Sequence, residues 1–298
     1  MNLKRLQELT ALAAPSGYED PVMRVMRREM GRMAGDVRVD RLGNVIARLP
    51  GPAGGGKPIM VFAHMDELGF VVRKIEPDGF LRVERLGGIP ERIAPGRAVH
   101  IVTPGGNVLG VVGMRSHHYT RPEEKNVVVP VQDLYVDVGA SSADQVAAMG
   151  VAVGNPICYA PFFHVQGDRV MAKTLDNRAG CEVLLETLER VAGLARLRDL
   201  VFVGTVQEEF SLRGVLPTFP VIQPEVAVAL DVAVACDTPD LRSVSDTRLG
   251  GGPVVSLYTF HGRGTLGGLI PNPKLVAAVL VTFLVSFLVS SLRCATRN

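Results

Sequence analysis

The chain has 298 residues, of which 47% are hydrophobic and 21% charged, a composition typical of a globular protein and not of a disordered one. Its 32 basic and 30 acidic residues give a formal net charge of +2 and are mixed along the chain, so nucleic acid is not expected as a partner. The four cysteines form no Cys-x-x-Cys pair, and the first residues lack the apolar run of a secretory signal. We therefore expect reduced thiols and a cytoplasmic protein.

The chain begins with two predicted helices. Leucines recur at helical spacing over residues 3–12, which predicts a first amphipathic helix. Ser16 and Glu19 then have the spacing of a capping box, and the proline at position 21 suits the first turn of a second helix that continues to Met33.

Strand patterns follow these helices. Residues 37–49 and 58–72 alternate in a strand-like way and are separated by a glycine-rich turn. Between residues 72 and 164 the pattern changes to short strands punctuated by glycines, with one helical stretch near residues 143–149. We interpret residues 72–164 as a separate β-rich domain.

The last part of the pattern returns to alternating helices and strands. Residues 180–194 predict an amphipathic helix, and residues 200–206 and 226–230 predict buried strands. This order is typical of an α/β fold with a largely parallel sheet flanked by helices. The predicted architecture is a discontinuous α/β domain, residues 1–71 and 165–298, interrupted by the β-rich insertion.

Several apolar segments end on a histidine or a carboxylate, namely at His64, Asp176, Glu208, Glu209 and Asp231. In an open α/β sheet the carboxyl ends of the strands line one crevice, so these side chains are predicted to converge. A mixed set of nitrogen and oxygen ligands suits zinc, cobalt or manganese. The pattern therefore predicts a metal site.

Each of these residues also has a simpler interpretation. His64 alone could be a hydrogen-bonded core histidine, but Asp66 follows on the same side of an extended chain, where it can orient the imidazole. Asp176 and Asp231 could cap or begin local structure. Glu208 and its neighbour could form a solvated acidic turn, or could divide their roles between metal binding and base catalysis, because adjacent extended residues point to opposite sides.

Five segments together resemble a known family, the glutamyl or tetrahedral aminopeptidases, which are cytosolic dinuclear metallopeptidases. The resemblance covers roughly residues 1–275, in order and in spacing. The segments that carry it are Ala13-Ala14-Pro15-Ser16-Gly17, Ala63-His64-Met65-Asp66-Glu67-Leu68-Gly69, Leu175-Asp176-Asn177-Arg178-Ala179-Gly180, Thr205-Val206-Gln207-Glu208-Glu209 and Leu230-Asp231-Val232.

The resemblance implies a phosphorylase/hydrolase-like catalytic domain with a mixed sheet flanked by helices, an inserted β-rich dimerisation domain, and homo-oligomers built from dimers. It also implies two divalent metal ions per subunit. His64 would bind one ion, Asp176 would bridge both, and Glu209 and Asp231 would bind the ions from either side.

The resemblance also implies that Glu208 would be the catalytic base and that Asp66 would support His64. The implied activity is hydrolysis of N-terminal residues from peptides by a water that the two ions activate. One alternative is an N-acyl amino acid amidohydrolase, or an endoglucanase-labelled relative, on the same scaffold. Another is a non-catalytic assembly subunit.

The C-terminal part departs from the family, whose members supply a last histidine ligand late in the chain. No histidine follows His261 here, and residues 275–292 are nearly all apolar. This segment could be a transmembrane anchor, a buried element of an altered fold, or an out-of-frame end. We favour the third interpretation, because the similarity stops abruptly after Leu275, and we do not expect a membrane as a partner. An incomplete C-terminus that lacks one ligand predicts reduced or absent activity.

Overall fold

The computed structural model describes residues 1–258 and 270–282. The chain divides into two compact units, Met1–Val232 and Ala233–Asn298. All of the predicted site residues lie in the first unit, which contains both the α/β sheet and the β-rich segment.

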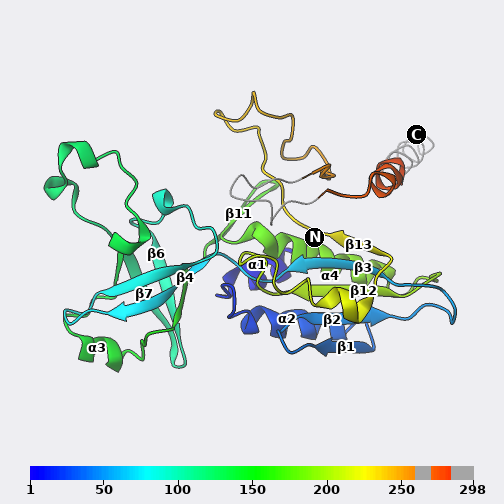
Figure 1. Cartoon of the computed structure of the whole chain (residues 1–298), viewed down its shortest axis with the longest axis horizontal. Coiled ribbons are helices and arrows are strands. Elements are labelled where there is room, and N and C mark those ends of the chain that lie inside the picture. Colours follow the sequence, from blue (N-terminus) through cyan, green and yellow to red (C-terminus); the bar gives the residue numbers. More distant parts are fainter. Residues whose placement is uncertain (259–269, 283–298) are drawn as a thin grey trace. The chain divides into compact units, whose positions relative to one another are not determined.

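A five-stranded mixed sheet forms the centre of the α/β part. The strand β3 pairs in parallel with β12 on one side and with β13 on the other, while β2 runs antiparallel to both β12 and β1. The strands in spatial order are β1 (Asp36–Val39), β2 (Val45–Leu49), β12 (Leu200–Thr205), β3 (Ile59–His64) and β13 (Val226–Ala229) (Figure 1). The predicted α/β class with a mixed sheet is confirmed.

Alternating side chains of the sheet enter two separate apolar clusters. Ala63 and Phe202 belong to a core that also contains side chains of the helices α1, α2 and α4, whereas Met60 and Val203 face the other side. The helices are α1 (Leu3–Ala11), α2 (Asp20–Gly31), α4 (Leu175–Val191) and the short α5 (Thr218–Ile222). Both faces of the sheet therefore contribute to apolar clusters, which favours the strand ends as the place for a site.

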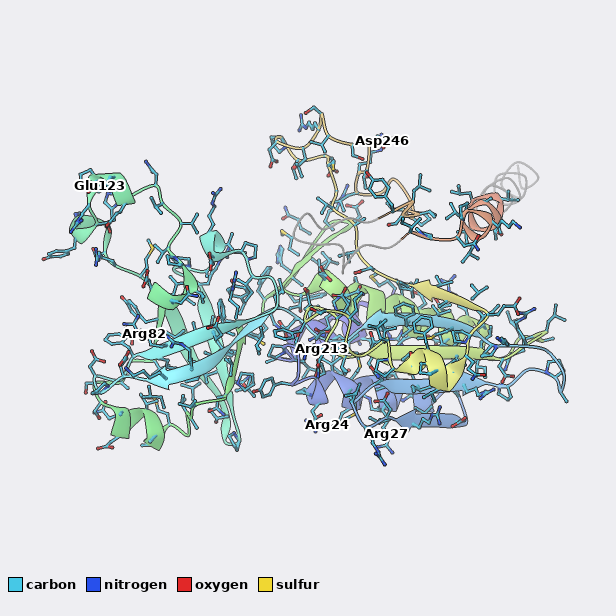
Figure 2. The ribbon with its side chains drawn as sticks, in the orientation of Figure 1. Arg24, Arg27, Arg82, Glu123, Arg213 and Asp246 are labelled. Carbon is cyan, nitrogen blue, oxygen red and sulfur yellow. The ribbon has the colours of Figure 1, made fainter. Side chains whose placement is uncertain are left out.

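The helix α2 shows how the sequence directs this packing. Val22, Val25 and Met26 recur on one side and are buried in the core. Arg24 and Arg27 occupy the opposite side, are exposed, and point away from the sheet (Figure 2). The apolar stripe therefore fixes which face of the helix meets the sheet.

The predicted capping box of α2 is wrong. The Glu19 side chain caps no amide of the helix; its Oε1 accepts hydrogen bonds from the backbone N–H groups of Gly17 and Gln207 instead. The Ser16 hydroxyl donates to Asp66. The helix begins only at Asp20, so Ser16 lies too far upstream to reach its first amides.

The β-rich segment is a closed barrel with an apolar interior that includes Phe70, Leu81 and Ile157. Its strands in spatial order are β4 (Gly69–Ile75), β5 (Leu81–Leu86), β8 (Tyr135–Asp137), β7 (Gly106–Gly113), β6 (Ala98–Thr103) and β9 (Pro156–Tyr159). Closure leaves no free sheet edge within the barrel.

Shorter elements connect these parts. The helix α3 (Ala143–Ala148) is capped by the Ser142 side chain, which accepts from the Gln145 amide, and it matches the predicted helical stretch. A two-stranded ribbon, β10 (Phe163–Gln166) and β11 (Arg169–Ala172), precedes α4. The 3-10 turns are Glu91–Ile93, His117–Tyr119, Pro122–Glu124 and Val131–Asp133.

A buried ion cluster joins the start of the chain to the strand ends. The Glu67 carboxylate accepts from Lys173 Nζ at 2.7 Å, from Arg178 Nη2 at 3.3 Å and from the Ala14 amide at 3.0 Å. Arg178 Nε also donates to the backbone oxygen of Leu9. All three charged side chains are nearly inaccessible to water. The cluster therefore ties the end of α1 to the segments that contain Asp66 and Asp176.

The C-terminal segment is described only in part. Residues 273–282 are helical. In the ranges 1–258 and 270–282, no helix combines the length and the apolar character needed to cross a bilayer. His261 and the rest of the apolar stretch 275–292 lie outside the described residues.

The buried cluster predicts a large effect on stability. Lys173→Met should lower the free energy of unfolding by about 3 kcal/mol, because the buried Glu67 Oε2 and the backbone oxygen of Leu12 then lose their ammonium donor. Urea unfolding followed by circular dichroism measures the change. Lys4→Met, the same substitution at an exposed position of α1, is the control. Equal free energies of unfolding for the two variants would show that the cluster does not stabilise the fold.

Candidate metal centre

His64, the last residue of β3, lies at the centre of the predicted constellation. Its Nε2 atom is 3.1 Å from Asp176 Oδ1, 3.8 Å from Asp231 Oδ1 and 3.9 Å from Glu208 Oε2. Because β12 and β13 flank β3 in parallel, the segments that follow all three strands emerge at the same edge of the sheet. Residues more than a hundred positions apart in sequence are thereby brought together.

The side chains form two sets with metal-ligand spacing. The ligand atoms of His64, Asp176 and Asp231 all lie within 4.8 Å of one another. The same holds for His64 with Glu208 and Glu209. One imidazole nitrogen combined with carboxylate oxygens is a donor set that suits zinc, cobalt or manganese. The arrangement therefore fits divalent cations.

Asp66 has no exposed surface and orients His64 by contacts with its Nδ1 atom, on the side of the ring away from the other carboxylates. The Nδ1 atom of His64 is 3.2 Å from the backbone oxygen of Asp66 and 3.4 Å from its Oδ1. A proton on Nδ1 satisfies these acceptors, and a metal ion would take the place of the Nε2 proton that faces Asp176. The Ser16 hydroxyl holds the other carboxylate oxygen, Oδ2, at 2.6 Å.

The same carboxylate also holds the Glu208–Glu209 segment. The backbone N–H of Glu208 donates to Asp66 Oδ1 at 3.0 Å, and that of Glu209 donates to Oδ2 at 3.1 Å. Asp66 thus links the histidine and the two glutamates through direct hydrogen bonds. The solvated-turn interpretation of the two glutamates is not favoured, because both are partly buried and their amides are held by a buried carboxylate.

Asp176 lies in an irregular backbone segment that precedes the regular part of α4. Asp176 and Asn177 both have non-helical dihedral angles, so the regular helix begins after them. Asn177 is fully buried; its Nδ2 donates to the backbone oxygen of Leu230 at 2.8 Å, and its Oδ1 accepts from the Gly180 amide. Leu230 immediately precedes Asp231, and Asn177 immediately follows Asp176. The hydrogen bond from the Asn177 side chain therefore connects the segments that contain Asp176 and Asp231. A Cβ at Gly180 would lie 2.1 Å from Asn177 Oδ1, which explains the glycine there.

Electrostatics of the cluster favour a bound cation. Burial opposes the charged form of His64, but hydrogen bonds with Asp176 and Asp66 outweigh it and raise the pKa of the imidazole to about 10. Burial, with a contribution from Asp176, raises the pKa of Glu209 to about 7. Burial likewise raises the pKa values of Glu208 and Asp231. The charged imidazole offsets only part of this surplus of carboxylates, and a divalent ion would replace its proton and supply more positive charge.

Several residues that support the site have contacts that the sequence does not predict. The spacing of Ser16 predicts a helix cap, and Asn177 has no predicted role beyond its place in the family motif. Cys181, at the start of the regular part of α4, donates its thiol hydrogen to the backbone oxygen of His64 at 3.1 Å. The only signal for Ser16 and Asn177 is their place in the motif, whereas nothing in the sequence marks Cys181.

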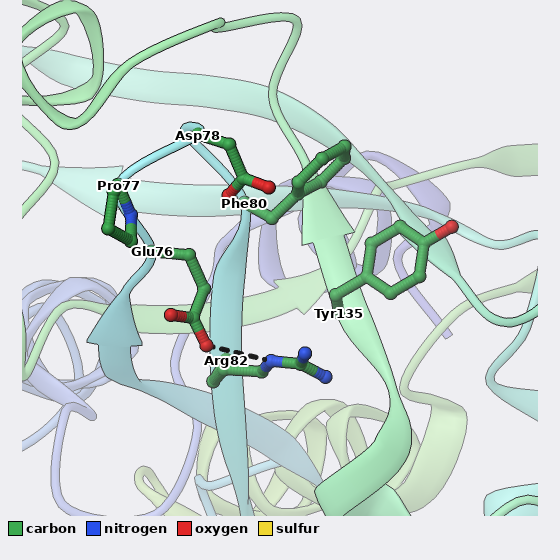
Figure 3. Close-up of a pocket in the computed structure, with 6 residues that line it drawn as sticks. All are labelled: Glu76, Pro77, Asp78, Phe80, Arg82 and Tyr135. Carbon is green, nitrogen blue, oxygen red and sulfur yellow. Dashed lines mark hydrogen bonds and ion pairs between the residues drawn. The ribbon is translucent and has the colours of Figure 1, made fainter.

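A surface hollow on the barrel contains none of the predicted site residues. It is lined by Glu76, Pro77, Asp78, Phe80, Arg82 and Tyr135 (Figure 3). Arg82 Nε donates to Glu76 Oε1 at 3.1 Å, and the Phe80 and Tyr135 rings meet edge to face. The Arg82–Glu76 pair is neutralised, in contrast to the uncompensated carboxylates around His64.

Comparisons with known proteins agree with this geometry. The family model for M42 glutamyl aminopeptidases matches residues 43–281. The putative aminopeptidase SgcX of Escherichia coli is 40% identical over 264 residues, which cover 88% of this chain and 71% of the relative.

Two solved structures resemble this chain. Aminopeptidase APDkam598 from Desulfurococcus kamchatkensis has a TM-score of 0.78 and 38% identity, covering 84% of this chain and 68% of that one. The Pyrococcus horikoshii TET1 peptidase, described as assembling into a tetrahedron or a large octahedral shell, has a TM-score of 0.71 and 32% identity, covering 80% and 70%. The chain therefore belongs to the M42 glutamyl aminopeptidase family.

Proposed function

We propose that this protein is a metal-dependent aminopeptidase that hydrolyses N-terminal residues from peptides. The observation that carries the proposal is the convergence of His64, Asp176 and Asp231 within 4.8 Å, beside a partly buried Glu208. Membership of a peptidase family supports the same chemistry.

Two groups of side chains would hold the ions. His64, Asp176 and Asp231 would bind one cation, and Asp176 with Glu209 would contribute to a second. When bound, such ions polarise a carbonyl oxygen and lower the pKa of a water molecule. The second position would have two carboxylates and no imidazole of its own. We therefore propose that the second ion is held more weakly than the first.

Glu208 would act as the general base and acid. Its carboxylate is partly buried 3.9 Å from His64 Nε2, and burial raises its pKa, which makes it a stronger base. It would take a proton from the attacking water and deliver it to the leaving amine. Asp66 would keep both His64 and Glu208 in place for this transfer.

The surplus of carboxylates also bears on the substrate. A free α-amino group is positively charged and would be attracted by Glu208, the carboxylate that would hold no metal ion, whereas an acylated amine is not. This favours an aminopeptidase over the N-acyl amidohydrolase alternative. Endoglucanase activity and a purely structural assembly role are supported by no feature of the described site.

We also propose that the barrel, within residues 72–164, is a dimerisation domain of a homo-oligomer. Leu109 and Val111 lie on the same side of β7 and are 60% and 46% exposed, so they offer apolar surface for a second copy. The described assembly of the TET1 peptidase supports this proposal. The buried free thiols of Cys158 and Cys181 fit the cytoplasmic location expected from the sequence.

Metal removal tests the proposal directly. After dialysis against a chelator, hydrolysis of an aminoacyl p-nitroanilide should disappear, and adding zinc, cobalt or manganese should restore it. Bound metal measured by mass spectrometry should show one tightly held ion and a second that is lost first. His64→Ala should remove the tight ion. Activity that survives complete chelation would contradict the proposal.

Substitution of Glu208, the proposed base, tests proton transfer separately from metal binding. Glu208→Gln should lower kcat on the order of a hundredfold to ten-thousandfold, because the amide cannot accept the proton. Its bound metal should equal that of the wild type. Glu123→Gln, the same change on the exposed surface of the barrel (Figure 2), should leave kcat unchanged. Full activity of Glu208→Gln would assign the base elsewhere.

A pair of substrates tests the requirement for a free amine. Leucyl p-nitroanilide should be hydrolysed, and its N-acetylated twin should be hydrolysed at least about a hundredfold more slowly, since acylation removes the charge that the carboxylates attract. Faster hydrolysis of the acetylated twin would favour the amidohydrolase alternative.

A further inference from the structure

The turn after β12 is held by buried side chains from three separate segments. Four consecutive backbone N–H groups, those of residues 206–209, each donate to a side-chain oxygen. The last two donate to Asp66. The N–H of Val206 donates to Asn44 Oδ1 at 3.0 Å, and that of Gln207 donates to Glu19 Oε1 at 2.9 Å.

Gln207 needs such a restraint. Its φ angle is +52°, in the left-handed region that side chains other than glycine adopt at a cost. It directly precedes Glu208, so a change in its backbone would redirect the Glu208 side chain. Ser211 and Leu212, further along the turn, also have positive φ, but Gln207 is the one that adjoins Glu208 and contacts Glu19.

Glu19 is well placed to provide a rigid contact. The residue is only 5% exposed, and the same Oε1 atom also accepts the Gly17 amide at 2.8 Å. Its backbone oxygen accepts the amides of Val22 and Met23 at the start of α2. Because α2 is packed into the core through Val22 and Met26, the carboxylate is fixed to the body of the domain.

We propose that Glu19 is a positioning residue that aims the Glu208 carboxylate through its hydrogen bond to the Gln207 amide. The inference rests on the proposed function, which makes Glu208 the base. Glu19 belongs to neither set of ligand groups around His64, so it would not itself hold a metal ion. The required property is an acceptor oxygen at this place, not a negative charge.

Two substitutions separate the acceptor from the charge. Glu19→Gln keeps an oxygen that can accept both amides, so its kcat should stay within about threefold of the wild type. Glu19→Ala removes the acceptor, and its kcat should fall by about tenfold to a hundredfold, because small misplacements of a reacting group have effects of this order. KM and bound metal should be unchanged in both variants. Asp20→Asn, at the adjacent exposed position, is the control.

Hydrogen exchange measured by mass spectrometry observes the contact without relying on activity. A peptide spanning residues 203–212 should exchange faster in Glu19→Ala than in the wild type, and at the wild-type rate in Glu19→Gln and Asp20→Asn. If Glu19→Ala does not fold, Glu19→Asp, whose shorter side chain withdraws the acceptor, takes its place and should behave in the same way.

Two results would overturn the inference. One is unchanged exchange of the 203–212 peptide when the acceptor is removed or withdrawn. The other is a loss of kcat in Glu19→Gln as large as in Glu19→Ala, which would show that charge and not the acceptor matters. A wild-type protein that hydrolyses no unblocked substrate would instead contradict the proposed function, and the exchange rates would still decide whether Glu19 holds the turn.

Discussion

The Asp66 carboxylate is the interaction on which the site depends. One oxygen lies beside His64 Nδ1 and accepts the Glu208 amide, and the other accepts the Ser16 hydroxyl and the Glu209 amide. Burial opposes the charged form of Asp66, yet hydrogen bonds from His64 and Ser16 keep its pKa below the usual value. A buried and ionised acceptor can therefore hold an imidazole and a backbone turn at once, which a neutral side chain could do only in part.

Glu67, the residue after Asp66, connects the site to the interior of the fold. Glu67 joins Lys173 and Arg178, which flank Asp176 in the sequence, so the dipeptide Asp66-Glu67 contacts both the site and the segment that presents another predicted ligand. Successive residues of an extended chain point in opposite directions, which lets one serve the site and the other the interior. Stability and site geometry are consequently coupled at this strand end.

The sequence predicts the sheet and the converging side chains because both follow local rules. Apolar strands that end on His64 or Asp231 are visible as patterns, and parallel pairing then requires their ends to meet. The roles of Ser16, Glu19 and Asn177 could not be predicted in this way. Their partners lie 50 or more residues away, so their local spacing indicates a helix cap or a motif and gives no information on the tertiary contact. The capping-box prediction fails for this reason.

Anomalous X-ray scattering at the zinc or manganese edge, from crystals grown with that metal, tests the central claim most directly. The account predicts an ion at about 2.0 to 2.2 Å from His64 Nε2 and from carboxylate oxygens of Asp176 and Asp231, with Asp66 still hydrogen-bonded to the histidine. An anomalous peak elsewhere on the protein, with none between these three side chains at saturating metal, would contradict it.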